Sequence, residues 1–392
     1  MRSAALLSLL PLALAAPVQE AGAPVLVPRG ATANSKYIVR LKKPAADGFS
    51  IQSTAGQVTS CINSIVADAE ERYDNVGAFS AHLDDADLAS LRANPSVAYI
   101  EKDATMSLQV TQTGAPWGLA RLSNTAPGST TYTYDATAGA GACVYIIDSG
   151  VDVSHPEFEG RASQPKNAVD SDAADRNGHG THVAGTIGSK TYGVAKKTKI
   201  FSVKVFGASG QTTNAIVMAG MDWVVADAPK RAAECPRGIV VNMSLGGGAS
   251  QAIDDAAAAM VSSGLAVMVA AGNGDSLGRA VSASTSSPAR APSVCTIGAT
   301  DRSDKVGTFS NYGPLVDVHG PGVSILSTLP DGRTGTLTGT SMATPHVAGL
   351  AAYFLGTGQT TAANACSFIV SKAQSGVISG LRSDTKNLLI HN

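Results

Sequence analysis

Apolar runs of strand length recur along the last two thirds of the chain, with amphipathic stretches between them. Four of these runs are typical of strands buried on both faces: residues 144–147, 200–205, 239–241 and 265–269. Helical spacing of apolar residues is found over residues 180–187, 213–225 and 252–262. Alternating strands and helices predict an α/β fold with a mostly parallel, doubly covered sheet. In such a sheet a functional site lies at the carboxyl ends of the strands.

The first quarter of the chain has a different pattern, which predicts a small separate domain. A strand, an amphipathic helix and two further strands are expected at residues 37–41, 58–69, 79–83 and 97–100. A second, short helix is capped by Asp84 and ended by Asn94 and Pro95. We expect the order strand, helix, strand, strand, helix, strand, which is the βαββαβ pattern of a two-layer domain. Residues 104–129 are expected to form a linker and surface arm, with a domain boundary near residue 110.

The N-terminus has the composition of a secretory signal. Arg2 precedes an apolar stretch over residues 4–16, and Ala13 and Ala15 have the small-x-small spacing that signal peptidase accepts. At about 1.5 Å per residue, a helix over this stretch is too short to cross the ~30 Å hydrocarbon core of a membrane. We therefore expect a signal peptide over residues 1–15 and a secreted, extracellular protein with no membrane partner.

Composition and charge narrow the possible partners. The chain has 29 basic and 30 acidic residues, a formal net charge of −1, and 44% hydrophobic residues. Because there is no basic excess, nucleic acid is not expected as a partner. None of the 5 cysteines lies in a Cys-x-x-Cys pair, so we expect disulfides and no zinc site. Cys61 stands alone in the first quarter, and if that quarter is removed the other four could pair in three ways.

Two residues at expected strand and helix ends are candidates for catalysis. Asp148 directly follows the run 144–147, which places a carboxylate at the carboxyl end of a strand. His179 lies between two glycines at the start of a helix, where no bulky neighbour shields its ring. His179 and His182 could instead share a helical face as metal ligands, but the Glu and the i, i+4 spacing of metalloprotease helices are missing. His182, next to Val183, is expected to be a buried core residue.

A serine within a run of small residues is the third candidate. Residues 339–349 read Gly-Thr-Ser-Met-Ala-Thr-Pro-His-Val-Ala-Gly. The small neighbours expose Ser341 at the start of a helix, whose first N–H groups and positive dipole end would stabilise a developing anion. A serine in this position is suited to nucleophilic attack in acyl transfer. His346, in the same run, is expected to be a structural residue of the helix.

The three candidates follow one another in the order Asp, His, Ser, which is the order in subtilisins. The segments Asp-Ser-Gly at 148–150, His-Gly-Thr-His at 179–182 and Gly-Thr-Ser-Met-Ala-Thr-Pro-His at 339–346 resemble the three signatures of subtilisin-like serine proteases. Residues 115–121 and the positions of the four later cysteines are similar to those of the fungal proteinase K group. Residues 36–103 resemble the inhibitory propeptide of this family. The alternative is a pseudoprotease that binds peptides without cleaving them, but no triad member is missing.

The resemblance implies a serine endopeptidase in which Ser341 is the nucleophile, His179 the general base and Asp148 the residue that orients the imidazole. It implies Asn273 as the oxyanion donor beside the backbone N–H of Ser341. The residues implied to line the primary specificity pocket carry no charge and are Ser244, Leu245, Gly246, Ala270, Ala271 and Gly272. We therefore expect broad specificity for protein and peptide substrates, with a preference for large apolar or aromatic residues before the scissile bond.

The resemblance also implies that the protein is made as a zymogen. The expected parts are the signal peptide, a propeptide over residues 16–109 and a catalytic domain over residues 110–392. The propeptide would inhibit the catalytic domain of its own chain until self-cleavage at or near the bond between Gln109 and Val110. Beyond substrates and its own propeptide no partner is expected, and the protein should be a monomer.

Disulfides and calcium are further implications of the resemblance. The implied disulfides are Cys143–Cys235 and Cys295–Cys366. No cofactor is expected for the reaction, but a structural calcium ion would be bound by Asp317 with the backbone carbonyls of Pro292 and Val294. The family's second, weaker calcium site uses an acidic residue where this chain has Val377, so that site is not expected.

Overall fold

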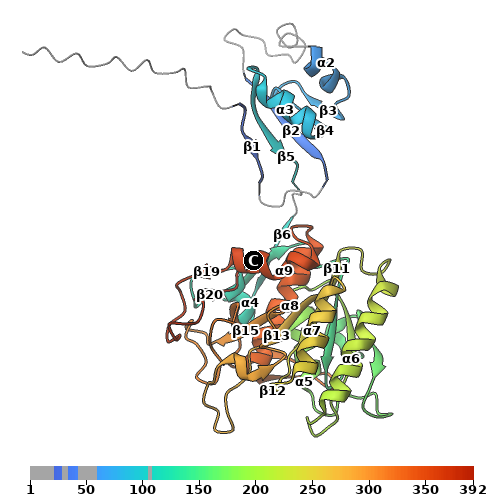
Figure 1. Cartoon of the computed structure of the whole chain (residues 1–392), viewed down its shortest axis with the longest axis vertical. Coiled ribbons are helices and arrows are strands. Elements are labelled where there is room, and N and C mark those ends of the chain that lie inside the picture. The colour runs from blue at the N-terminus through green and yellow to red at the C-terminus, as the bar shows by residue number, and fades with distance from the viewer. Residues whose placement is uncertain (1–21, 29–33, 43–59, 105–107) are drawn as a thin grey trace, which may run out of the picture. The chain divides into compact units, whose positions relative to one another are not determined.

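The computed structural model describes residues 22–28, 34–42, 60–104 and 108–392 (Figure 1). The chain divides into two compact units, Met1–Ala104 and Thr105–Asn392. The expected signal peptide lies outside the described residues. Within the described ranges, no helix is long and apolar enough to cross a membrane.

The first unit is a small sheet with two helices, as the sequence predicted. In spatial order its strands are β1 (Val25–Leu26), β5 (Val97–Lys102), β2 (Lys36–Leu41), β4 (Ala78–His82) and β3 (Glu71–Tyr73). Its described helices are α2 (Ser60–Ala67) and α3 (Asp85–Ala93). β3 is the additional strand that the predicted order required between α2 and β4, whereas β1, which pairs in parallel with β5, was not predicted. Asp84 caps α3 by accepting hydrogen bonds from the backbone N–H groups of Ala86 and Asp87, which confirms the predicted start of this helix.

The second unit is built on a nine-stranded sheet with the order β19-β20-β16-β15-β13-β11-β8-β10-β9. In that order the strands are Gln374–Ser375, Leu388–Leu389, Val318–Pro321, Cys295–Thr300, Ala266–Ala270, Gly238–Met243, Ala142–Asp148, Lys199–Lys204 and Ala162–Asn167. Neighbouring strands are parallel except for β19 and β20. The predicted parallel α/β sheet is therefore confirmed, and the four predicted apolar runs are β8, β10, β11 and β13. The strands β15 and β16, which carry glycines, were not predicted.

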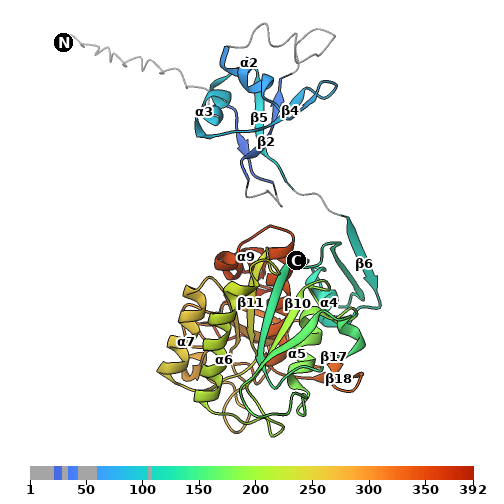
Figure 2. The same ribbon diagram turned by 90° about the vertical axis from the view of Figure 1, so that its right-hand side faces the viewer.

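Helices cover both faces of this sheet (Figures 1 and 2). They are α4 (Trp117–Leu122), α5 (His179–Gly188), α6 (Asn214–Asp227), α7 (Gln251–Ser262), α8 (Thr340–Gly356) and α9 (Ala365–Lys372). Successive side chains of β8 enter different cores, because side chains alternate between the faces of a strand. Val144 and Ile146 pack in the core that contains α5 and α8, whereas Tyr145 and Ile147 pack in the core that contains α6 and α7. The sequence predicted α5, α6 and α7 to within two residues at each end.

The stretch 104–129, predicted to be only a linker and surface arm, contains two regular elements. β6 (Gln109–Thr113) pairs antiparallel with β7 (Thr131–Asp135), and α4, which lies between them in the sequence, inserts Leu119 and Leu122, which are 1% and 0% exposed, into the core. The prediction was therefore wrong for this part. The helix is too short for its apolar residues to produce a recognisable periodicity, and the glycines and prolines around it dominate the pattern.

Short elements and two disulfides complete the second unit. Two further antiparallel pairs are β12 with β14 and β17 with β18, at Gly247–Gly248, Ser286–Ser287, Ile325–Leu329 and Arg333–Leu337. The 3₁₀ helices are Pro156–Phe158, Ala228–Arg231, Ala283–Thr285 and Ala362–Asn364. The structure contains the disulfides Cys143–Cys235 and Cys295–Cys366, which are the pairs implied by the resemblance. Cys61 lies in α2, and its side chain is outside the described part of the chain.

Candidate active site

Asp148 and His179 meet because β8 ends beside the start of α5. Asp148 is the last residue of β8 and is 2% exposed, and His179 is the first residue of α5. The Nδ1 atom of His179 lies 2.8 Å from Oδ1 of Asp148. An ideal Cβ on Gly180 would lie only 2.0 Å from the carbonyl oxygen of Gly150, so a glycine is required for this close approach. This geometry would let Asp148 fix the orientation of the imidazole.

The electrostatics of His179 favour its protonated form. Burial lowers the pKa of His179, but the charge of Asp148, its hydrogen bond to the ring and the charge of Asp175 raise it by more. The net result is a pKa above the ordinary value of 6.5. Such a histidine can accept a proton from a neighbouring hydroxyl and hold it as an imidazolium.

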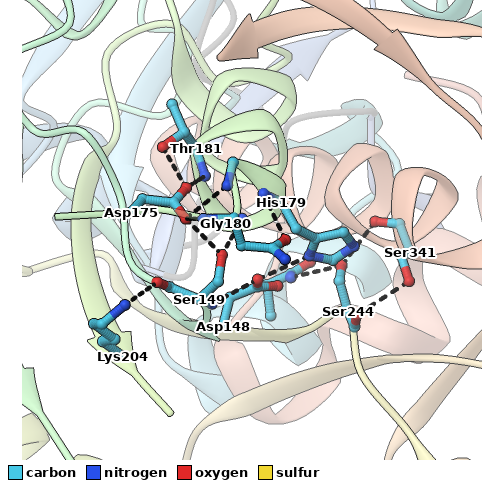
Figure 3. A network of polar contacts seen from close by, with 12 residues as sticks. Asp148, Ser149, Asp175, His179, Gly180, Thr181, Lys204, Ser244 and Ser341 are labelled. Carbon is cyan, nitrogen blue, oxygen red and sulfur yellow. Dashed lines mark hydrogen bonds and ion pairs between the residues drawn. The ribbon is translucent and has the colours of Figure 1, made fainter. Parts of the chain in front are cut away.

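A second buried carboxylate, Asp175, ties these two elements together (Figure 3). Its Oδ1 accepts hydrogen bonds from Oγ of Ser149 at 2.9 Å and from N of Gly178 at 2.8 Å. Its Oδ2 accepts from N and Oγ1 of Thr181 at 2.9 and 2.6 Å. Oγ of Ser149 in turn accepts from N of Gly180 at 2.9 Å. The first turn of α5 is thus bound to the residue that follows Asp148.

Asp175 was not predicted from the sequence, although a signal was present. An acidic residue shortly before a helix commonly binds the free N–H groups of the first turn. Lys204, which is 1% exposed, adds to the same network by donating to the carbonyl oxygens of Ser149 and Ala174 at 2.8 and 3.2 Å. Its partners are distant in sequence, so no local pattern identifies it.

Ser341 lies at the start of α8 and is the only residue of that helix that is not buried. Its Oγ donates to the carbonyl oxygen of Ser244 at 3.0 Å, and Oγ of Ser244 donates to the carbonyl oxygen of Ser341 at 2.8 Å (Figure 3). Ser244 follows β11, so these two bonds attach the start of α8 to the carboxyl edge of the sheet. For attack on a substrate, Oγ of Ser341 must turn from Ser244 towards the imidazole.

Two N–H donors converge beside Gly339, directly before α8. Oδ1 of Asn273 accepts from N and Oγ1 of Thr340, both at 2.8 Å, which fixes the amide of Asn273. An ideal Cβ on Gly339 would lie 3.3 Å from Nδ2 of Asn273 and 3.6 Å from N of Ser341. The space left free by this glycine is therefore close to both donors. An oxyanion in that space could accept from both of them.

The residues expected to line the primary specificity pocket leave neighbouring strands. Ser244, Leu245 and Gly246 follow β11, and Ala270, Ala271 and Gly272 follow or end β13, which pairs with β11 in parallel. These segments contain no charged residue. Gly272 has a φ of +102°, and an ideal Cβ there would lie 2.4 Å from Nδ2 of Asn311, so glycine is required at this position.

The other histidines of the signatures are structural. His182 and His346 are 0% and 1% exposed, and burial lowers the pKa of each to about 4. Nε2 of His182 is 2.8 Å from the carbonyl oxygen of Ile325. Over residues 22–28, 34–42, 60–104 and 108–392, the only cluster of three potential metal-ligating side chains is Cys295, Asp317 and Cys366. His179 and His182 do not belong to any such cluster in this part of the chain.

The carboxylate expected to bind calcium is already engaged. Oδ1 of Asp317 lies 2.8 Å from Nζ of Lys386, and Oδ2 accepts from N of Thr296 at 3.0 Å. Pro292 and Val294, whose carbonyls were expected to complete the site, precede β15. An ammonium group and a divalent cation repel each other at one carboxylate, so this set of residues does not fit a calcium ion. Val377 stands where the family's second calcium site has an acidic residue. Its side chain is 37% exposed and has no atom that could bind a metal ion.

These features together define a class of protein. An aspartate and histidine at hydrogen-bond distance, a serine at the start of a buried helix, and two N–H donors beside it are the parts of a serine hydrolase. Comparison with known sequences narrows the class. Residues 139–385 match the Subtilase family and residues 36–109 match Peptidase inhibitor I9, so the chain belongs to the subtilase family and has an inhibitor propeptide.

Individual relatives agree with this assignment. Proteinase R of Parengyodontium album is 47% identical over 100% of this chain and 99% of its own, and the cuticle-degrading protease of Metarhizium anisopliae is 45% identical over 100% of both chains. Proteinase T of Parengyodontium album is 54% identical over 75% of this chain. A solved structure of a cold adapted subtilisin-like serine proteinase matches with a TM-score of 0.65 and 41% identity, over 71% of this chain and 98% of that one. The chain is therefore a serine endopeptidase with a subtilisin-like fold, a class that needs no catalytic cofactor.

Proposed function

We propose that Ser341, His179 and Asp148 are the catalytic residues of this endopeptidase. The observation that carries the proposal is the 2.8 Å contact between His179 and Asp148 at the carboxyl edge of the sheet that also holds Ser341. In each of the helices α5 and α8, the proposed catalytic residue is the one residue that is not buried. Substrate can therefore reach both side chains while the rest of each helix stays fixed in the core.

The reaction starts when Oγ of Ser341 leaves the carbonyl of Ser244 and attacks the peptide carbonyl carbon. His179 takes the hydroxyl proton on Nε2, and Asp148 stabilises the resulting imidazolium through Nδ1. The negative charge moves to the substrate oxygen, which accepts from Nδ2 of Asn273 and N of Ser341.

Collapse of this intermediate breaks the C–N bond and leaves an acyl group on Ser341, while His179 returns its proton to the leaving amine. Water then attacks the acyl carbon, and His179 accepts its proton. Collapse of the second intermediate releases the carboxylic acid and returns that proton to Ser341.

The proposed specificity is broad, with a preference for large apolar or aromatic residues before the scissile bond. The segments after β11 and at the end of β13 have no charged side chain to pair with a basic or acidic residue of the substrate. The remaining contacts of a cleft of this kind are made to the substrate backbone, which all sequences share. Peptides that differ only at the residue before the cut, with Phe, Leu, Lys or Glu there, should rank in that order of kcat/KM, with the charged residues last.

We further propose that the protein is secreted as a zymogen that cleaves itself near Gln109 and Val110. A Ser341→Ala chain secreted from a protease-deficient host should accumulate as residues 16–392, whereas the parent should begin near Val110. N-terminal sequencing and intact mass measure both products. A Ser341→Ala product that already begins at Val110 would show that another protease makes the cut.

The catalytic assignment is tested by labelling with a serine-directed fluorophosphonate and mapping the modified residue. The parent should be labelled on Ser341, and the Ser341→Ala and His179→Ala variants should not be labelled. Ser367→Ala is the matched control, since Ser367 is an exposed serine of α9 and its loss should leave the labelling unchanged. A label on another serine, or a labelled chain without peptide turnover, would contradict the proposal.

A further inference from the structure

Asp317 joins two segments of the second unit that are far apart in the sequence. It directly precedes β16, and its Oδ2 accepts from N of Thr296 in β15 at 3.0 Å. Its Oδ1 is 2.8 Å from Nζ of Lys386, 69 residues later. The side chain of Asp317 is 24% exposed and that of Lys386 is 45% exposed. Both carboxylate oxygens therefore have a partner within the chain.

We propose that the ammonium group of Lys386 takes the place of a calcium ion at Asp317, and that this lysine is what excludes calcium there. Calcium in proteins is surrounded by about six to eight oxygen ligands at roughly 2.3–2.6 Å. Here the one carboxylate is shared with a backbone N–H and an ammonium group. The other metal-ligating side chains of the same cluster are Cys295 and Cys366, whose sulfurs form a disulfide and are not ligands for a hard cation. Without the ammonium group, the further ligands would be the backbone carbonyls of Pro292 and Val294 and water.

Hydrogen bonds of the two neighbouring residues also fix the segment that carries Lys386. On one side of Lys386, Oγ1 of Thr385 accepts from N of Gly313 at 2.9 Å. On the other side, the side chain of Asn387 accepts from N of Ile378 at 2.9 Å and donates to its carbonyl oxygen at 2.8 Å. β20 follows directly and pairs with β16, so Asp317 and Lys386 stand at the beginnings of two neighbouring strands.

The ammonium group of Lys386 and a bound calcium ion would stabilise the surroundings of Asp317 in different ways. Calcium stabilises by mass action, so its effect depends on the free calcium concentration. The ammonium group of Lys386 is part of the chain, so its local concentration is fixed by the fold and a chelator cannot remove it. Salt screens an ion pair that is partly exposed, so its contribution should fall as ionic strength rises.

The experiment compares calcium responses in a Ser341→Ala background, where self-digestion cannot disturb the measurement. The variants are Lys386→Met, which removes the charge and keeps an unbranched side chain, Lys386→Arg, which keeps the charge, and Asp317→Asn. Lys199→Met is the matched control, because Lys199 is 46% exposed and forms a 2.9 Å ion pair with Glu234. The readouts are Tm with calcium or with chelator, and calcium binding by calorimetry.

In the Ser341→Ala chain with Lys386 intact, the addition of Asp317→Asn should change neither the calcium response of Tm nor the number of calcium ions bound. Lys386→Met should gain one calcium ion and a calcium-dependent rise in Tm of about 5 °C or more at saturation. This gain should disappear when Asp317→Asn is added, and it should be absent from Lys386→Arg and Lys199→Met.

Two results would overturn the proposal. One is a calcium ion in the chain with Lys386 intact that is lost on Asp317→Asn. The other is a Lys386→Met chain that gains no calcium ion. If Lys386→Met does not fold, the comparison of calcium binding with and without Asp317→Asn still decides whether calcium occupies this place. The test does not depend on the catalytic residues, since every chain lacks Ser341.

Discussion

His179 and Ser341 each stand at the start of a buried helix, but different interactions fix the two helix starts. The first turn of α5 is bound by the carboxylate of Asp175, and its histidine is bound by the carboxylate of Asp148. The first turn of α8 has no carboxylate, and the amide oxygen of Asn273 binds Thr340 there. Charged groups therefore fix the start of α5 and the proposed base, whereas neutral hydrogen bonds to Asn273 and Ser244 and apolar packing fix the start of α8 and the proposed nucleophile. Substitutions at the start of α5 and substitutions at the start of α8 should therefore change different properties of the enzyme.

Asp148→Asn should cause the largest effect among substitutions that leave Ser341 and His179 in place. An amide would donate to Nδ1 of His179 and force the tautomer that cannot accept the serine proton. We expect kcat to fall about 10⁴-fold, the size found when other serine proteases lose this charge. Steady-state kinetics at neutral pH measure it, with fluorophosphonate labelling slowed in parallel. A loss of less than tenfold would remove Asp148 from the mechanism.

Asn273→Ala tests the serine side and should lower kcat about 10²- to 10³-fold with little change in KM. This magnitude is the value known for the loss of one oxyanion donor in subtilisin, and we carry it over. Asn273→Asp separates the two roles of the amide, because it keeps an oxygen for Thr340 and loses the Nδ2 donor. It should be at least as inactive as Asn273→Ala but closer to the parent in Tm. Equal kcat for the parent and both variants would exclude Asn273 as a donor.

Asp175→Asn should have a smaller effect on kcat, about tenfold, because Asp175 positions the base without touching the substrate. It should also move the acid limb of kcat/KM. His179 must be neutral to act, so activity is lost as pH falls through its pKa, which the charges of Asp148 and Asp175 help to raise above 6.5 despite burial.

Removal of the Asp175 charge should therefore shift the acid limb to lower pH. Asp172→Asn is the matched control, since Asp172 lies in the same loop but pairs with Arg176 at the surface. The acid limb of kcat/KM for Asp172→Asn should coincide with that of the parent. An unshifted limb in Asp175→Asn, with kcat reduced, would mean that Asp175 acts only through structure.

Gly349→Ala should produce the smallest change and should affect stability more than catalysis. An added Cβ would lie 2.8 Å from Cβ of Val194 and 3.0 Å from the carbonyl oxygen of Ile187, at the contact between α8 and α5. Overpacking costs about 1–3 kcal/mol, and the better helix propensity of alanine offsets about 1 kcal/mol. We expect a net loss of roughly 1 kcal/mol, or a Tm lower by about 2–4 °C.

Gly248→Ala is the control for this change, because an added Cβ there has no heavy atom within 4 Å. Its Tm should remain that of the parent. If Gly349→Ala lowered kcat more than Asp175→Asn does, activity would depend more on the packing of α8 than on the charge that fixes the start of α5.

The sequence predicted those parts of the molecule whose signals are local. The central strands β8, β11 and β13 contain continuous apolar runs, and β10 is apolar at Ile200, Phe201 and Val203, as expected for strands buried on both faces. The positions of Asp148, His179 and Ser341 at strand and helix ends were visible for the same reason, since each lies next to a strong pattern. The proposed oxyanion donor Asn273 was indicated only by the resemblance, because an Asn followed by Gly is otherwise an ordinary turn.

Features that depend on distant partners could not be predicted. Lys204 contacts carbonyl oxygens that are distant in the sequence, and no spacing along the chain encodes those contacts. The bonds of Asp175 to the first turn of α5 had a local signal, but its bond to Ser149 did not. The contact of Lys386 with Asp317 spans 69 residues. No local pattern therefore indicated that Asp317, the expected calcium ligand, forms an ion pair within the chain. β15 and β16 were missed because their small residues are buried by neighbouring strands and not by their own hydrophobicity.

The antiparallel pairing of β6 and β7 sets a condition on the timing of the proposed cut. Gln109 pairs with Asp135 and Val110 with Tyr134, so the scissile bond lies inside a paired strand. A protease binds its substrate through the same backbone groups that a hairpin uses. The bond can therefore be cut only while β6 is detached, and the observed rate should equal the cleavage rate multiplied by the open fraction. Each opening is reversible until cleavage occurs, whereas hydrolysis is not, so the opening equilibrium of β6 would set the pace of the proposed maturation.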